Sequence, residues 1–77
     1  METTPMTRFF FDYVSDGQVM HDYQGRYYAN AQAAREYAEL LALDLEHMGE
    51  WDGFAVCVRN AHGQEFFSTP VRAMEAA

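Results

Sequence analysis

The feature that most constrains the fold is an aromatic run that ends in a turn signal. The segment Arg8–Val14, Arg-Phe-Phe-Phe-Asp-Tyr-Val, is followed at once by Ser15-Asp16-Gly17. Aromatic and β-branched residues favour extended structure, and an Asp-Gly pair is a strong signal for a hairpin turn. We therefore predict a strand over residues 8–14 that opens a hairpin at Asp16-Gly17.

The position of this turn sets the cross-strand pairs. With Asp16-Gly17 as the central residues, the pairs are Ser15 with Gln18, Val14 with Val19, Tyr13 with Met20 and Asp12 with His21. Successive side chains of a strand point to opposite faces. One face therefore carries Phe9, Phe11, Tyr13 and Met20, and the other carries Phe10, Asp12 and Val14.

A helix is predicted over Ala31–Met48. Asn30 is a good N-cap because its side-chain oxygen accepts a free amide of the first turn, and Gly49 suits the position after the last turn. Apolar residues recur every three or four positions and form one stripe that faces the core, with Tyr37 on its flank. The stripe consists of Ala34, Ala38, Leu41, Leu45 and Met48.

The remaining segments complete an α+β fold. Asp22–Gly25 indicates a turn, and Arg26–Tyr28 a connector or short strand. A second hairpin is predicted from strands over Phe54–Arg59 and Gln64–Val71, in which Pro70 indicates an edge or a strand end. We expect the order ββαββ, with one helix packed on one face of a small antiparallel sheet. A single domain would span residues 8–71, between flexible tails over residues 1–7 and 72–77.

Composition excludes several classes of function. The chain has 77 residues, five Arg, no Lys and twelve Asp plus Glu, for a net charge of −7. Binding to nucleic acid or to an anionic membrane needs a basic surface, so neither partner is expected. The single cysteine, Cys57, allows no internal disulfide, and Met1–Met6 shows no secretory signal. We therefore expect a cytoplasmic protein.

The ordered motifs resemble a family of small, uncharacterised bacterial domains of unknown function. The matching elements are Arg8–Asp12, the Asp16-Gly17 turn, the Asp22–Gly25 step, the Ala-rich helix and the Val56-Cys57-Val58 hairpin. This chain departs from the pattern at Tyr27-Tyr28-Ala29. The resemblance implies a fold and no established activity.

The chain also shows a fainter resemblance to the antitoxins of the Hic toxin–antitoxin class. The shared features are Gly25 and the Ala33-Ala34…Ala38 run in the helix. The loop residues that precede the helix in that class are missing here, so the likeness stays an analogy.

No pattern of ionisable residues identifies a chemistry. His21, His47, His62 and Cys57 lack the spacing of metal ligands, so no metal, cofactor or catalytic residue is assigned. Asp12 and His21 are the most chemical pair, because a carboxylate that orients an imidazole is half of an acid–base device. A small enzyme or metal-binding domain built on these two residues is the alternative from another class.

Apolar residues outside the core indicate self-association. A helix on one face leaves the other sheet face open, with Phe10, Val14, Val19, Ala55, Cys57 and Phe66 on it unless the chain ends and Trp51 cover them. Leu43 lies opposite the core stripe of the helix, and Leu40 on its flank. Exposed apolar patches mark interfaces. Our interface residues are Phe10, Val14, Leu40 and Leu43, in a non-enzymatic interaction module that forms a homo-oligomer, most simply a homodimer.

An acidic strip offers a different partner. Asp44, Glu46, Glu50 and Asp52 crowd the C-terminal end of the helix, where the helix dipole favours cations. A strip that breaks this rule can serve as a docking surface for a basic protein. An antitoxin-like or adaptor role with such a partner is the second alternative.

Overall fold

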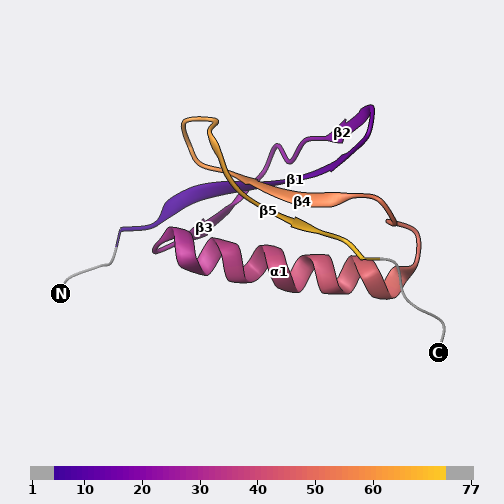
Figure 1. Cartoon of the computed structure of the whole chain (residues 1–77). Helices are drawn as coiled ribbons and strands as arrows, with labels where there is room; N and C mark the ends of the chain where they lie inside the picture. The colour runs from indigo at the N-terminus through magenta and orange to yellow at the C-terminus, as the bar shows by residue number, and fades with distance from the viewer. Residues whose placement is uncertain (1–4, 73–77) are drawn as a thin grey trace.

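A computed structural model describes residues 5–72, which form one helix and five strands (Figure 1). The elements in chain order are β1 (Thr7–Ser15), β2 (Gln18–Met20), β3 (Arg26–Tyr28), α1 (Ala31–Met48), β4 (Ala55–Arg59) and β5 (Glu65–Pro70). The α+β class and the packing of one helix against one face of an antiparallel sheet are confirmed. The ends of the expected tails, residues 1–4 and 73–77, lie outside the described residues, and Thr7 belongs to β1.

The sheet is organised around β1. β4 pairs with one edge of β1, and β5 pairs with the far side of β4. The other edge of β1 is shared, because β2 pairs with Tyr13–Ser15 and β3 with Thr7–Phe9. Arg26–Tyr28 is therefore a true strand, which changes the element order from the expected ββαββ to βββαββ.

The predicted hairpin register is confirmed. Tyr13 pairs with Met20, Val14 with Val19 and Ser15 with Gln18. β2 ends at Met20, so His21 lies just beyond the ladder. The Asp16-Gly17 turn therefore sets the faces of β1 as expected, with Phe9 and Phe11 buried under the helix.

Both predicted ends of α1 are confirmed. The Asn30 side chain accepts a hydrogen bond from the Ala33 N–H at 2.9 Å. At the other end Gly49 adopts a left-handed conformation, with φ of 74°, and its N–H donates to the Glu46 carbonyl. Each cap satisfies a backbone group that the helix itself leaves unpaired.

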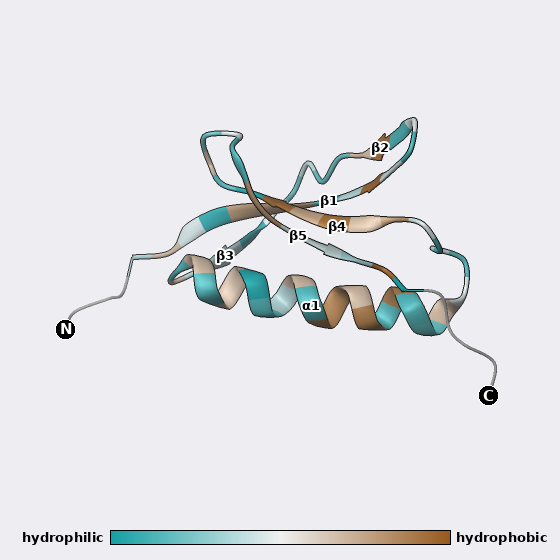
Figure 2. Ribbon diagram, viewed as in Figure 1, coloured by the Kyte–Doolittle hydropathy of each residue, from teal (hydrophilic) through white to brown (hydrophobic). Residues whose placement is uncertain are grey.

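The buried stripe of α1 differs from the prediction at one end. Ala34, Ala38 and Leu45 are buried as expected, but Ala42 joins them and Met48 remains 59% exposed. The buried side of the helix is turned toward Ala42, so Leu41 is only half-buried and Met48 lies on the flank. Figure 2 shows the hydrophobic residues gathered on β4 and on the C-terminal half of α1.

Two further expectations for the open sheet face are corrected. A register shift between Val58 and Arg59 turns Phe66 to the helix side, where its ring meets Phe9 edge to face at 5.7 Å. Trp51 also lies on the helix side, against Tyr13 and Phe54, so it does not cover the open face. Within residues 5–72 no helix is long and apolar enough to cross a membrane.

Candidate functional site

The shared edge of β1 is closed by a polar turn. Between β2 and β3 the chain leaves the ladder, and the Asp22 carboxylate takes the place of a strand partner by accepting the Phe11 N–H at 3.2 Å. Its other oxygen accepts the N–H groups of Gln24 and Gly25, each at 3.0 Å. Asp side chains commonly bond the backbone that follows them in this way.

Gly25 is required by this turn for two reasons. Its φ is +71°, in the left-handed region that side chains disfavour, and a Cβ there would lie 2.7 Å from the Phe9 carbonyl oxygen. Arg8 completes the turn from β1, because its guanidinium donates to the carbonyls of Tyr23 and Gln24. The Asp22–Gly25 step in the sequence is therefore explained by structure.

A buried ion pair lies directly behind the turn. Asp12 is only 3% exposed, and its carboxylate accepts two hydrogen bonds from Arg59, at 2.5 and 3.1 Å. It also accepts the backbone N–H of Asp22 at 2.9 Å. Arg59 donates further to the Asp22 carbonyl at 3.3 Å. Arg8, Asp12, Asp22, Gly25 and Arg59 thus form one connected network, which we call the polar clasp.

The electrostatics of the clasp favour the charged pair. Burial raises the pKa of Asp12, but the hydrogen bonds from Arg59 and from the Asp22 N–H, with the charges of Arg59 and His21, outweigh it, and the pKa falls below its usual 3.8. The hydrogen bond to Asp12 raises the pKa of Arg59 above its ordinary value. Both groups therefore stay ionised over the physiological pH range.

The clasp extends onto the open sheet face through Phe10. The guanidinium of Arg8 and that of Arg59 each lie 4.9 Å from the centre of the Phe10 ring. Cations at this distance are attracted to the ring face. Phe10 is consequently half-buried, and less of its ring is free for a partner than the sequence suggests.

Asp12 and His21 are neighbours as expected, but the contact between them is weaker than the contacts of Asp12 with Arg59 and with the Asp22 backbone. His21 Nδ1 lies 3.6 Å from Asp12 Oδ1, which is longer than a hydrogen bond. The oxygens of Asp12 are already occupied by Arg59 and the Asp22 backbone. Asp12 is also buried, although it lies on the sheet face away from the helix. Asp12 therefore has a structural role, because its carboxylate links the backbone of the turn at Asp22 to Arg59 of β4.

Across residues 5–72 no group of three or more His, Cys, Asp or Glu side chains is arranged to hold a metal ion. The buried Cys57 thiol donates to the Ser68 hydroxyl at 3.6 Å, and burial raises its pKa, which keeps it in the unreactive thiol form.

The four interface residues do not form one surface. Phe10 and Val14 lie on the open face of the sheet, whereas Leu40 and Leu43, exposed by 61% and 51%, lie on the far side of the molecule on α1. An interface between identical patches can use only one of these sides.

The acidic strip is also divided. Glu46 borders a groove between α1 and β5. Asp44 is two residues away, so it points to the other flank of the helix. Glu50 and Asp52 lie in the exposed segment that follows. The strip is therefore a ring of charges around the helix end and not a single docking face.

Sequence reasoning missed Arg59, a member of the polar clasp, and Arg26, which lies over the ring of Tyr37 and borders a hollow beside it. The alternation in β4 places Arg59 on the face of Cys57, but its position beside Asp12 depends on the pairing of β4 with β1, which the sequence did not indicate. The position of Arg26 likewise depends on the pairing of β3 with β1.

Taken together, the fold and the clasp define a small α+β domain in which buried charge fixes the strand that connects to the helix. The chain belongs to the family described as Domain of unknown function (DUF6894), whose model matches residues 8–72. This confirms the resemblance to an uncharacterised domain family. No match is found among curated proteins or among solved structures.

Proposed function

We propose that this protein is a non-enzymatic interaction module that pairs with a second copy of itself through the outer edge of β5 and the adjoining flank of α1. The observation that carries the proposal is the unpaired edge of β5 beside a charge pattern that complements itself. The sequence also led us to expect a self-associating interaction module. The surface proposed here is smaller than the one expected then, because it includes Leu43 but not Phe10, Val14 or Leu40.

The outer edge of β5 has backbone groups that can form hydrogen bonds with another strand. Within residues 5–72 no strand covers this edge. The Val71 N–H donates inward, to the Phe54 carbonyl at 2.8 Å. Because backbone direction alternates along a strand, Thr69 also points inward, whereas Ser68 and Pro70 point outward. An antiparallel copy with Ser68 on the twofold axis would exchange two hydrogen bonds between the Ser68 residues.

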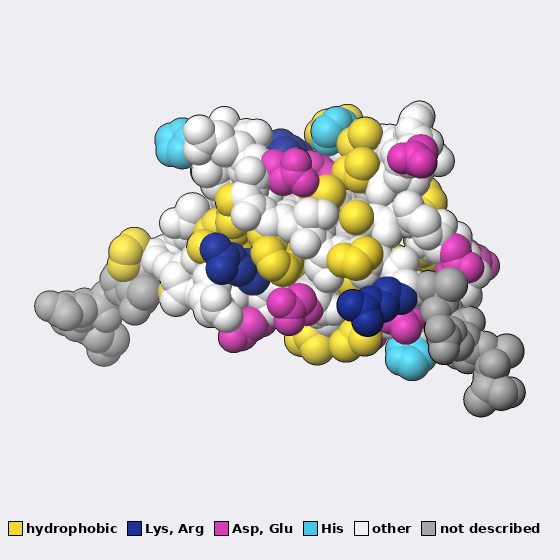
Figure 3. All heavy atoms as spheres, in the orientation of Figure 1, with side chains coloured by type: hydrophobic (Ala, Val, Ile, Leu, Met, Phe, Trp, Pro, Cys, Tyr) yellow, Lys and Arg dark blue, Asp and Glu magenta, His cyan; other side chains and the backbone are white. Residues whose placement is uncertain are grey.

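The flank of α1 beside β5 carries a matching pattern. Arg35 lies over the rings of Phe66 and Phe67, at 6.0 and 5.8 Å. Further along the helix, Glu39, Leu43 and Glu46 border a groove of about 390 Å³ against β5, and Arg72 also borders it. Figure 3 shows this side of the molecule, where arginine and acidic side chains alternate above the helix.

A twofold axis at Ser68 makes this pattern complementary. Arg35 lies beside the start of β5 and Glu46 beside its end, so the axis brings Arg35 of one copy toward Glu46 of the other. The same axis places Glu39 of both copies near each other. Opposite charges across an interface fix its register, and like charges suppress other arrangements. Leu43 lies between them and supplies apolar surface to bury.

Burial against a second copy also suits the size of the domain. A chain of 77 residues buries about 60% of its unfolded surface, and association commonly adds stability to such small cores. Leu43 is a better anchor than Phe10, because the ring of Phe10 is already covered by two guanidinium groups.

The experiment is sedimentation equilibrium on wild type and matched variants. Leu43→Glu should shift the wild-type dimer toward monomer, and Leu40→Glu, on the exposed face of the same helix, should not. Arg35→Glu should weaken the dimer by placing two acids opposite each other, and Arg35→Glu with Glu46→Arg should restore it. Circular dichroism on each variant confirms that the monomer stays folded.

Two outcomes would overturn the proposal. A wild-type protein that stays monomeric at high concentration would remove self-association altogether. Dissociation by Leu40→Glu or Phe10→Glu, with Leu43→Glu unaffected, would move the interface to another face.

A basic protein partner remains the second candidate, because Glu50 and Asp52 are exposed and have no ion-pair partner in the described part of the chain. In a purified mixture with such a partner, Glu50→Gln with Asp52→Asn should slow association, and added salt should slow it in the wild type. An association rate that changes neither in the double variant nor with added salt would contradict this role.

A further inference from the structure

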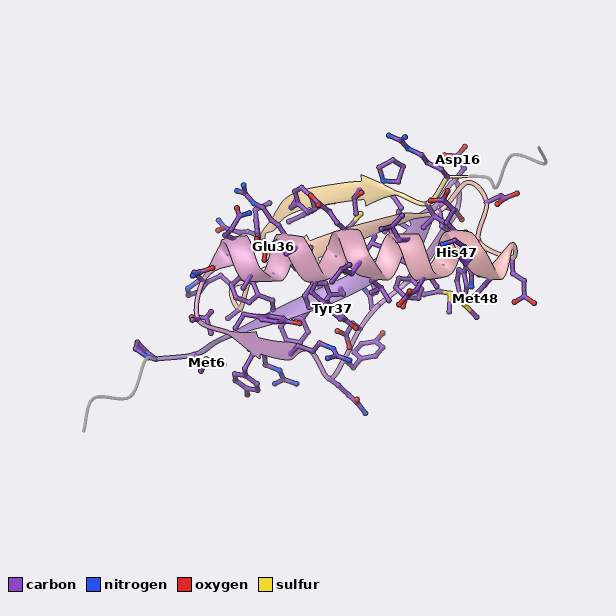
Figure 4. All side chains as sticks on the ribbon, turned by 90° about the horizontal axis from the view of Figure 1, so that it is seen from below. Met6, Asp16, Glu36, Tyr37, His47 and Met48 are labelled. Carbon is purple, nitrogen blue, oxygen red and sulfur yellow. The ribbon has the colours of Figure 1, made fainter. Side chains whose placement is uncertain are left out.

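A hollow lies on the helix side of the sheet, beneath the shared edge of β1. It has a volume of about 290 Å³ and is bounded by β1, the segment after β2, and α1. Figure 4 shows Tyr37 reaching from α1 toward the strands on this side. The hollow exists because β2 and β3 meet β1 at different ends and leave the middle of that edge to the polar clasp.

Aromatic rings form the walls of the hollow. Phe11 is buried at its base and meets Tyr37 edge to face at 4.9 Å, while Tyr13 and Leu41 are half-buried beside them. Rings in this arrangement present both faces and edges to a flat apolar body. The volume is at the lower end of the roughly 300–1,000 Å³ of small-molecule sites, so it suits a single ring and a short substituent.

The polar groups at the rim differ in whether their hydrogen-bonding atoms are already paired. Asp22 borders the hollow, but its oxygens are occupied by the backbone N–H groups of Phe11, Gln24 and Gly25. Arg26 lies 4.4 Å from the centre of the Tyr37 ring and forms no ion pair within residues 5–72. Its guanidinium therefore has donors free, although the chain carries more than twice as many acids as arginines.

The Tyr13 hydroxyl is a further donor beside the same space. Burial raises the pKa of Tyr13, as do the nearby Tyr37 and Asp22, and these effects outweigh the lowering by Arg26, so its hydroxyl keeps its proton. His21 also borders the hollow. Donors from Arg26 and Tyr13 border a space that Asp22 also lines with a carboxylate, whose oxygens accept backbone N–H groups. The free guanidinium of Arg26 is the group there that attracts an anion, and the negative charge of Asp22 opposes one.

We propose that this hollow binds a small aromatic carboxylate, with the ring between Tyr13 and Tyr37 and the carboxylate on Arg26. Guanidinium groups are suited to carboxylates because their parallel N–H donors match the two oxygens. The site is separate from the β5 edge, so it does not depend on self-association.

The test compares three probes with the same ring and similar length: phenylacetate, 2-phenylethanol and phenethylamine. In a ¹H–¹⁵N NMR titration, phenylacetate should cause saturable shifts confined to the residues around the hollow, with a dissociation constant of about 1 mM. The neutral and cationic probes should bind at least about tenfold more weakly, because they lack the charge that Arg26 recognises.

Arg26→Gln should remove the preference for phenylacetate, while Arg72→Gln, an exposed arginine beside β5, should leave it unchanged. Tyr13→Phe should weaken phenylacetate several-fold and serves as a second variant that keeps the aromatic wall. Shifts scattered over the surface, no saturation, or equal binding of phenethylamine would overturn the proposal. Preserved preference in Arg26→Gln would also overturn it.

Discussion

Replacing Asp12 with Asn tests how much of the stability depends on the polar clasp. The substitution keeps the shape of the side chain but removes its charge. Asp12 accepts two hydrogen bonds from Arg59 and one from the Asp22 backbone. An amide has one acceptor oxygen and would point its NH₂ group at a donor, so bonds are lost and Arg59 is left without its counterion.

The expected cost follows from the burial of the two partners. Removing one member of a buried ion pair costs about 3–5 kcal/mol. The Arg59 side chain is 25% exposed, which lets water recover part of that loss, and we expect about 2–3 kcal/mol. A domain of 77 residues has a total stability of about 4–12 kcal/mol, so the variant should remain folded but be clearly weakened.

Urea unfolding followed by fluorescence provides the assay. Trp51 is the single tryptophan and packs against Tyr13 and Phe54, so its emission reports on the core. With a slope of about 1 kcal/mol per molar urea, the midpoint should fall by roughly 2–3 M. Asp16→Asn, in the exposed turn, is the matched control and should change the midpoint little. If Asp12→Asn unfolds like this control, the clasp does not stabilise the fold.

The pH dependence gives an independent check. The folded pKa of Asp12 is lower than its usual 3.8, so its stabilisation is fully present above the unfolded value. It is lost as the pH falls through the lower folded value. The difference between wild type and Asp12→Asn should therefore be constant near neutral pH and shrink in acid. A difference that persists unchanged at the lowest pH where both proteins fold would contradict the assigned ionisation.

The remaining stability predictions concern local geometry. Gly25→Ala should destabilise the domain by at least about 1 kcal/mol more than Gly17→Ala, because both residues have positive φ but only Gly25 meets the Phe9 carbonyl. Equal midpoints in thermal unfolding would refute this. Asn30→Ala should cost about 1 kcal/mol by removing the N-cap, whereas Gln32→Ala, in the exposed first turn, should cost less. Comparable helix fraying in the two variants, measured by hydrogen exchange, would show that the cap is unimportant.

The parts of the fold that depend on neighbouring residues were predictable from the sequence. Asp16-Gly17 defined the hairpin register because a two-residue turn leaves no freedom in the pairs beside it. Asn30 and Gly49 defined α1 because capping uses side chains within a turn of the helix end. Each of these signals is local, and each is confirmed.

The parts that depend on distant residues were not predictable in the same way. Asp12 and Arg59 come from different halves of the chain, and only the β1–β4 pairing joins them. Hydrophobic spacing assigned Met48 to the core, but in the packed fold the buried side of the helix includes Ala42 and leaves Met48 exposed. Exposure of Leu43 was expected, but its position beside β5 needed the packed structure.

The pairing of β1 with β4 also has a consequence for how the chain is made. These two strands join residues 10–14 to residues 55–59, with α1 between them. As the chain leaves the ribosome, the aromatic segment of β1 emerges long before its partner on that edge. Contacts between such distant segments form slowly, and exposed apolar strands are prone to aggregate meanwhile. A nascent chain stalled at Gly49 would present the rings of Phe9 and Phe11 to any chaperone nearby.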